Sequence, residues 1–97
     1  RGDRGQNTAP FALAAGNYVA TYKTALRPGQ TSCYTSADLY RVTGTRLVES
    51  IYSTTLSQRD GQSSLTGETR IYGVTAGEHF FEVEETGCSW SVELRPQ

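Results

Sequence analysis

Short β-prone runs separated by turn residues recur about every ten residues, and this rhythm constrains the fold more than any other feature of the chain. The expected strands cover residues 11–14, 17–24, 33–42, 47–56, 65–72, 79–84 and 88–95. Helical periodicity of any length is absent from the sequence. The pattern predicts an all-β, mostly antiparallel β-sandwich with about seven to eight strands.

Turn residues punctuate these runs, and three of them carry specific expectations. Arg59-Asp60-Gly61 is typical of a β-hairpin turn. Gly67 interrupts the run at 65–72 and is interpreted as the site of a β-bulge. Glu85-Thr86-Gly87 is expected to form the turn between the last two strands.

The chain length of 97 residues favours one domain with a single hydrophobic core. Residues 1–8 (RGDRGQNT) are polar and glycine-rich and are expected to form a linker or N-terminal tail, which leaves 9–97 as the sandwich. The tripeptide at 1–3 matches the one that integrins bind, but such short motifs arise often by chance, so we interpret it as linker. The first residue is Arg, so an upstream segment is expected, with room for a signal peptide or membrane anchor.

The two cysteines, Cys33 and Cys88, predict a disulfide bond. With a single histidine in the chain they are too few for a zinc site, and their spacing fits no CxxC motif. Strand alternation places Cys33 on the face of Leu39 and Cys88 on the face of Trp90, so both thiols point inward. The alternative is two buried free thiols. A bridge is worth about 4 kcal/mol by the chain-entropy argument and predicts an extracytoplasmic, secreted or cell-surface location.

Charge and hydropathy exclude several partners. The net charge is −1 and the nine cations are scattered singly, so no basic stripe is available for nucleic acid. The longest apolar stretch, residues 9–15, is far shorter than the roughly 20 residues that span a bilayer, so no membrane insertion by this segment is expected. No cofactor motif and no calcium-loop spacing is present, so neither cofactor nor metal is expected.

Nucleophilic catalysis would need a base, and His79 is the only histidine. It shares a strand face with Phe81 and Val83, which favours a structural role over a Ser/His/Asp triad that uses Asp38 or Asp60. No catalytic residue is therefore expected, and the chain is not predicted to be an enzyme.

Glu82 and Glu84 lie on one face of their strand, with Glu85 after them. Paired carboxylates do acid–base work only in a cleft that separates their pKa values, and the sequence builds no such cleft. We interpret these residues as a solvated strand face.

Tyr34 and Tyr40 fall on the face opposite Cys33 and Leu39, with Asp38 between them. Exposed tyrosines beside a carboxylate are suited to a sugar ring or a protein partner, so Tyr34, Asp38 and Tyr40 form the predicted ligand face. The alternative is that a loop or the first strand covers them.

One internal echo is present. Ala15-Gly16-Asn17-Tyr18 opens one expected strand and Ala76-Gly77-Glu78-His79 opens another, each with larger or apolar residues at alternate positions. We expect both glycines to supply a special backbone conformation at the entry of two similar strands.

Ala37-Asp38-Leu39-Tyr40, followed further along by Ala76-Gly77 and an alternating aromatic strand, resembles the pre-peptidase C-terminal (PPC) domains of secreted bacterial enzymes. The layout is similar over residues 11–94, while the residues match only in the Asp-Leu-Tyr and Gly-x-aromatic elements. The resemblance implies a jelly-roll-like sandwich attached beside a catalytic domain. That family often has a second acidic residue before Asp-Leu-Tyr, whereas Thr35-Ser36-Ala37 stand here, so no calcium site is carried over to Asp38.

Together these features predict a non-catalytic extracytoplasmic accessory or interaction domain of a larger secreted or membrane-anchored bacterial protein. Its partner would be a protein or a glycan. A carbohydrate-binding module is the alternative, and a small hydrolase is a third candidate. Oligomeric state has no signal in the sequence.

Overall fold

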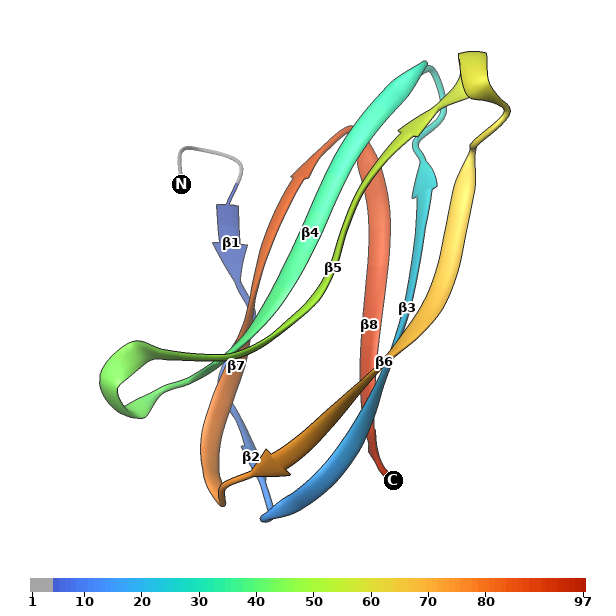
Figure 1. The fold of residues 1–97 in the computed structure, drawn as a ribbon. Helices are drawn as coiled ribbons and strands as arrows, with labels where there is room; N and C mark the ends of the chain where they lie inside the picture. Colours follow the sequence, from blue (N-terminus) through green and yellow to red (C-terminus); the bar gives the residue numbers. More distant parts are fainter. Residues whose placement is uncertain (1–4) are drawn as a thin grey trace.

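The computed structural model describes residues 5–97 and shows two antiparallel β-sheets packed face to face (Figure 1). Sheet A has the strand order β1-β7-β4-β5, with β2 also paired to β7, and sheet B has the order β6-β3-β8. The strands are β1 (Gly5–Asn7), β2 (Phe11–Leu13), β3 (Gly16–Leu26), β4 (Ser32–Arg41), β5 (Arg46–Ser57), β6 (Ser64–Val74), β7 (Gly77–Thr86) and β8 (Cys88–Pro96). The predicted all-β sandwich is therefore confirmed. Short 3₁₀ turns at Thr43–Thr45 and Gln58–Asp60 flank β5.

Most connections cross from one sheet to the other, which gives the jelly-roll-like winding that was predicted. From β2 onward, only β4 and β5 follow each other as a hairpin within one sheet. The expected hairpin at Arg59-Asp60-Gly61 is wrong, because β5 lies in sheet A and β6 in sheet B. The turn itself forms, with Gly61 at φ 75°, and a single bridge joins Ser57 to Gln62. Asp-Gly specifies the local reversal and not the sheet that the next strand enters.

The core fills the space between the inward faces of the sheets. The main cluster consists of Tyr18, Ala20, Ala37, Leu39, Ile51, Tyr52, Ile71, Val74, Phe81 and Val83. A second cluster surrounds the two cysteines together with Leu56. These residues follow the period-two alternation that the sequence shows, because neighbouring side chains on a strand point to opposite faces.

The ring of Tyr22 is the reason for a glycine at position 67, where a bulge was expected. Gly67 is paired regularly with Tyr22 across β6 and β3, so the expected bulge at this position is wrong. A Cβ at Gly67 would overlap the Tyr22 hydroxyl and lie 2.6 Å from its Cζ, so the tyrosine ring occupies the space over the glycine. The same ring stacks on Tyr52 of sheet A, with 4.6 Å between centroids. Gly67 thus allows Tyr22 to lie flat between the sheets.

The internal echo has a structural counterpart in two interlocked three-strand units, β2–β4 and β6–β8. In the first unit β3 pairs with β6 and β8, and in the second β7 pairs with β2 and β4. Gly16 and Gly77 open β3 and β7 with φ values of 147° and 141°, a region that strongly favours glycine. Gly16 lies opposite Val74, and Gly77 lies opposite Leu13, so each glycine pairs with the strand that precedes the other. The interpretation of the echo as two similar strand entries is confirmed.

The N-terminal segment was expected to be a linker over residues 1–8. Residues 1–3, with the Arg-Gly-Asp tripeptide, lie outside the described part of the chain. Gly5–Asn7 pair with β7 as strand β1, and the Thr8 amide donates to the Phe81 carbonyl at 2.9 Å. The amide of Phe81 in turn donates to the Thr8 hydroxyl. Within the described residues, this part of the expected tail is an edge strand of sheet A.

Candidate functional site

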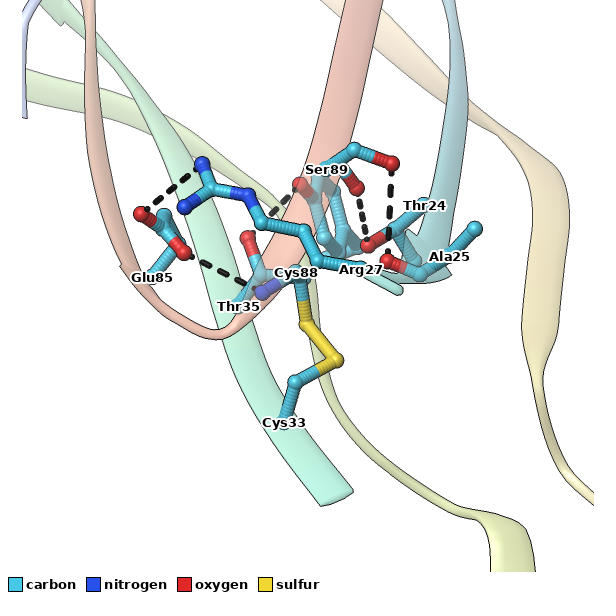
Figure 2. Close-up of a disulfide and its surroundings, with 9 residues drawn as sticks. Thr24, Ala25, Arg27, Cys33, Thr35, Glu85, Cys88 and Ser89 are labelled. Atoms are coloured by element: carbon cyan, nitrogen blue, oxygen red, sulfur yellow. Dashed lines mark hydrogen bonds and ion pairs between the residues drawn. A yellow bond between two sulfur atoms is a disulfide. The ribbon is translucent and has the colours of Figure 1, made fainter. Parts of the chain in front are cut away.

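The predicted disulfide is formed and joins the two sheets (Figure 2). Cys33 lies near the start of β4 and Cys88 opens β8, with 5.3 Å between their Cα atoms. Both cysteines are buried, with Cys88 fully so. The bridge therefore ties together the corresponding strands of the two interlocked units at one end of the sandwich.

Glu85 supports this end of the molecule. It was expected in a turn, but β7 continues to Thr86, and Gly87 at φ 78° is the one residue that separates β7 from β8. One Glu85 oxygen accepts from Arg27 Nη2 at 3.3 Å, and the other accepts from the Cys88 amide at 3.1 Å. Figure 2 shows both contacts beside the disulfide. Glu85 is thus part of a structural support for the bridge, and it does not share the outward face of Glu82 and Glu84.

The predicted ligand face lies on the outside of sheet A. Register places its side chains in rows across β7, β4 and β5. The rows are Thr86–Tyr34–Thr55, Glu84–Ser36–Ser53, Glu82–Asp38–Ser50 and Phe80–Tyr40–Leu47. Tyr34, Asp38 and Tyr40 therefore share one face, as expected, with Tyr34 two rows from Asp38 and Tyr40 in the row next to it.

The two tyrosines differ in their surroundings. Tyr34 is 37 % exposed, and its hydroxyl lies 3.3 Å from the Ser53 hydroxyl. Tyr40 is half-buried and stacks on Phe80, with 5.4 Å between centroids and 10° between the rings. Strands β1 and β2 extend sheet A sideways along β7 and do not lie over this face. The first strand therefore does not cover the predicted ligand face, which was the alternative expectation.

An apolar end completes this face. Leu47, opposite Tyr40, is 50 % exposed, and Val42, just after β4, is 38 % exposed. Three of the four exposed large apolar side chains of the described residues thus belong to β4, β5 or their connection, and the fourth is Tyr72 on β6. We call Tyr34, Asp38, Tyr40, Val42, Leu47 and Phe80 the aromatic face.

His79 lies in the interior. It is fully buried, and its Nδ1 lies 3.0 Å from the Gly77 carbonyl oxygen, while Nε2 has no hydrogen-bond partner among the described residues. Its neighbours across β2 and β4 are Phe11 and Arg41. Full burial fits the structural role that the sequence suggests.

A second feature, on the outside of sheet B, was missed by sequence reasoning. Two adjoining hollows of about 520 and 330 Å³ lie over the middle strand β3 and share Lys23, Thr66 and Ser91 in their walls. The larger is also lined by Thr21, Glu68 and Glu93.

The rows of this face match on both sides of β3. They are Ser64–Ala25–Ser89, Thr66–Lys23–Ser91, Glu68–Thr21–Glu93 and Arg70–Val19–Arg95. The signal was present in the sequence, since the outward positions of β6 and β8 repeat the order hydroxyl, hydroxyl, Glu, Arg, and Lys23 is the single lysine. We call Lys23, Ser64, Thr66, Glu68, Ser89, Ser91 and Glu93 the hydroxyl face.

Within residues 5–97, no three His, Cys, Asp or Glu side chains gather in a way that could hold a metal ion. No helix in this described part is long and apolar enough to cross a membrane. Searches of protein-family models, curated proteins and solved structures found no match to the chain. The likeness to PPC domains therefore stays an expectation from the sequence.

Proposed function

We propose that this chain is a non-catalytic accessory domain of a larger extracytoplasmic protein and that it binds a protein partner through the aromatic face. The observation that carries the proposal is the exposed apolar pair Val42 and Leu47 at one end of sheet A, next to the stacked pair of Tyr40 and Phe80. Aromatic side chains anchored in this way are typical of the energetic centres of protein interfaces.

The chemistry of the face indicates what the partner presents. Tyr40 and Leu47 offer a flat apolar area, and Asp38 lies in the next row. The partner surface would then carry apolar side chains opposite Tyr40 and Leu47 and a cation opposite Asp38. A glycan would use the same tyrosines differently, since sugar rings stack on exposed aromatic faces, whereas the Tyr40 ring is half-buried and already stacked on Phe80.

The setting of the domain is part of the same proposal. The buried disulfide that joins the sheets is compatible with an oxidising compartment, because such bonds persist there and are rare in the reducing cytosol. The resemblance to PPC domains supports a position beside a catalytic domain in a secreted bacterial protein.

Affinity capture from the extracytoplasmic fraction of the source cells tests the proposal. Wild-type domain, Tyr34→Ala/Tyr40→Ala and the remote control Arg59→Ala are immobilised side by side. We expect one partner that binds wild type and the control, that excess free domain displaces, and that the double variant loses. Equal capture by all three proteins, or capture of no protein by any of them, would contradict the proposal.

A further inference from the structure

We infer that the hydroxyl face of sheet B is a second binding site and that it takes an uncharged oligosaccharide. This inference concerns the opposite sheet from the aromatic face and does not depend on the function proposed above. The argument rests on the shape of the face, on the alternation of its charges and on the hydrogen-bonding groups it presents.

The shape comes from side-chain size along β3. Ala25 and Thr21 are small and lie on the middle strand, on either side of Lys23, while Glu68 and Glu93 project from the strands on both sides. The hollow of about 520 Å³ follows this difference and continues into the adjoining one. Arg95 of β8 reaches across β3 to Glu68 of β6, with 3.4 Å between Nη2 and Oε2, and closes one end. The result is a groove along the strand direction with one closed end.

The charges of the groove alternate in sign from row to row. Lys23 stands between the hydroxyls of Thr66 and Ser91, and the next row carries Glu68 and Glu93. An anionic ligand long enough to follow the groove would be repelled by the carboxylates, and a cationic one would be repelled by Lys23. For either ligand, the repulsion at one row would offset the attraction at another. An uncharged ligand avoids this conflict.

The polar groups of the groove match a ligand whose groups both donate and accept hydrogen bonds. Lys23 only donates, the carboxylates of Glu68 and Glu93 only accept, and the hydroxyls of Thr66 and Ser91 do either. Sugar hydroxyls have both capacities, so one saccharide chain can accept from the ammonium and donate to the carboxylates one row further along. Alternate residues on a strand are about 6.7 Å apart, which spaces these partners along an extended chain.

The groove also lacks what other macromolecules need. None of the outward-facing residues in its four rows is aromatic, and the one large apolar side chain, Val19, is buried between Arg70 and Arg95. Tyr22 and Trp90 also border the hollows, but both side chains pack against the core between the sheets. The energetic centres of protein interfaces are enriched in Trp, Tyr and Arg, whereas the outward rows of the groove present no Trp or Tyr and Arg95 is paired with Glu68. The cations Lys23, Arg70 and Arg95 are interleaved with the carboxylates of Glu68 and Glu93, and such a mixture of charges does not fit a phosphate backbone.

Amide NMR titration of the ¹⁵N-labelled domain tests the site directly. The probes are six uncharged hexasaccharides, namely cellohexaose, laminarihexaose, maltohexaose, xylohexaose, mannohexaose and N-acetylchitohexaose, each taken to millimolar concentration. A hyaluronan hexasaccharide and a chitosan hexamer serve as anionic and cationic comparisons. We expect at least one uncharged probe to give saturable shifts at amides of β3, β6 and β8 around Lys23, with weaker or no binding of the charged probes.

Two variants and their matched controls locate the site. Lys23→Met and Glu93→Gln should each weaken binding by about tenfold or more, since each removes a charged hydrogen-bond partner. Arg59→Met and Glu49→Gln likewise remove one cation and one carboxylate, but at exposed positions outside the groove, and should leave binding unchanged. The four positions are exposed, so each variant should fold like the wild type. An amide spectrum that matches the wild-type spectrum away from the substitution will show that it does.

Three results would overturn the inference. The first is the absence of saturable shifts around Lys23 with all six uncharged probes, and the second is equal binding by Lys23→Met and wild type. The third is a concentration-dependent dimer, seen by sedimentation, that Lys23→Met abolishes, because the face would then bind a second copy of the chain.

Discussion

Removing the Cys33–Cys88 bridge should cost this domain a large share of its stability. The two cysteines are 55 residues apart in the chain, and closing a loop of that length lowers the entropy of the unfolded state by an amount worth about 4 kcal/mol at 25 °C. Domains of this size have unfolding free energies of about 5–15 kcal/mol in total. The variant Cys33→Ala/Cys88→Ala should therefore keep about 1–11 kcal/mol, which is marginal at the lower end of this range.

Urea unfolding followed by the fluorescence of Trp90, the single tryptophan, measures this loss. We expect the free energy of unfolding to fall by about 4 kcal/mol and the thermal midpoint to fall by about 15 °C or more. The slope with urea should also be larger in the variant, because its unfolded chain is no longer held by the bridge. A loss below about 1 kcal/mol would refute the reasoning, as would free thiols in the denatured wild type.

Three further predictions follow from the interior. Gly67→Ala should lower the unfolding free energy by about 1–3 kcal/mol, since its Cβ meets the Tyr22 ring, and Tyr22→Phe in the same chain should recover part of that loss in a double-mutant cycle of urea unfolding. Burial raises the pKa of Tyr52 above 10.0, although the Thr35 hydroxyl at 3.1 Å opposes this and Tyr22 adds to it. As the pH rises, the Tyr52 hydroxyl therefore ionises first in the unfolded chain, so its contribution to the free energy of unfolding is fully present below about pH 10 and is lost above it. The free energy of unfolding should fall with pH less steeply in Tyr52→Phe than in wild type, and equal slopes in the two proteins would contradict the assignment. His79→Ala should lower stability by about 2–4 kcal/mol by leaving a cavity, and thermal unfolding with an unchanged midpoint would exclude the buried structural role.

The strands could be predicted from the sequence because sandwich strands alternate inward and outward residues. On β8, Cys88 and Trp90 face inward while Ser89 and Ser91 face outward, and this contrast is visible in the sequence alone. The same alternation placed both thiols on the inner side, which made the disulfide predictable. Helix signals did not compete with it anywhere in the chain.

The errors concern features that depend on tertiary contacts. Gly67 looks like a bulge in the sequence, but the reason for a glycine there is the Tyr22 ring on the neighbouring strand. Asp60-Gly61 encodes a reversal, while the choice of sheet for β6 depends on its pairing with β3. The expected turn at Glu85 is instead strand, because β7 stays paired with β4 through Glu85 and Thr86, opposite Thr35 and Tyr34.

The two surfaces differ in how far they could be predicted from the sequence. Tyr34, Asp38 and Tyr40 could be grouped because they lie on one strand, but their neighbours Phe80 and Leu47 come from β7 and β5 and join them only through register. The hydroxyl face depends on register even more, since β6 and β8 flank β3 from distant parts of the chain. Its repeated outward order on β6 and β8 was nevertheless available as a signal.

Site-specific photo-crosslinking tests most directly the central claim that the aromatic face binds a protein partner. A photoreactive phenylalanine replaces Tyr34 on sheet A in one protein and Ser91 on sheet B in another. Both proteins are incubated with the extracytoplasmic fraction of the source cells and irradiated. The account predicts a crosslinked protein of one defined mass from position 34 only, which disappears when Tyr40→Ala is added and when excess unlabelled domain competes. Crosslinks of equal yield from both positions, or none from position 34, would contradict it.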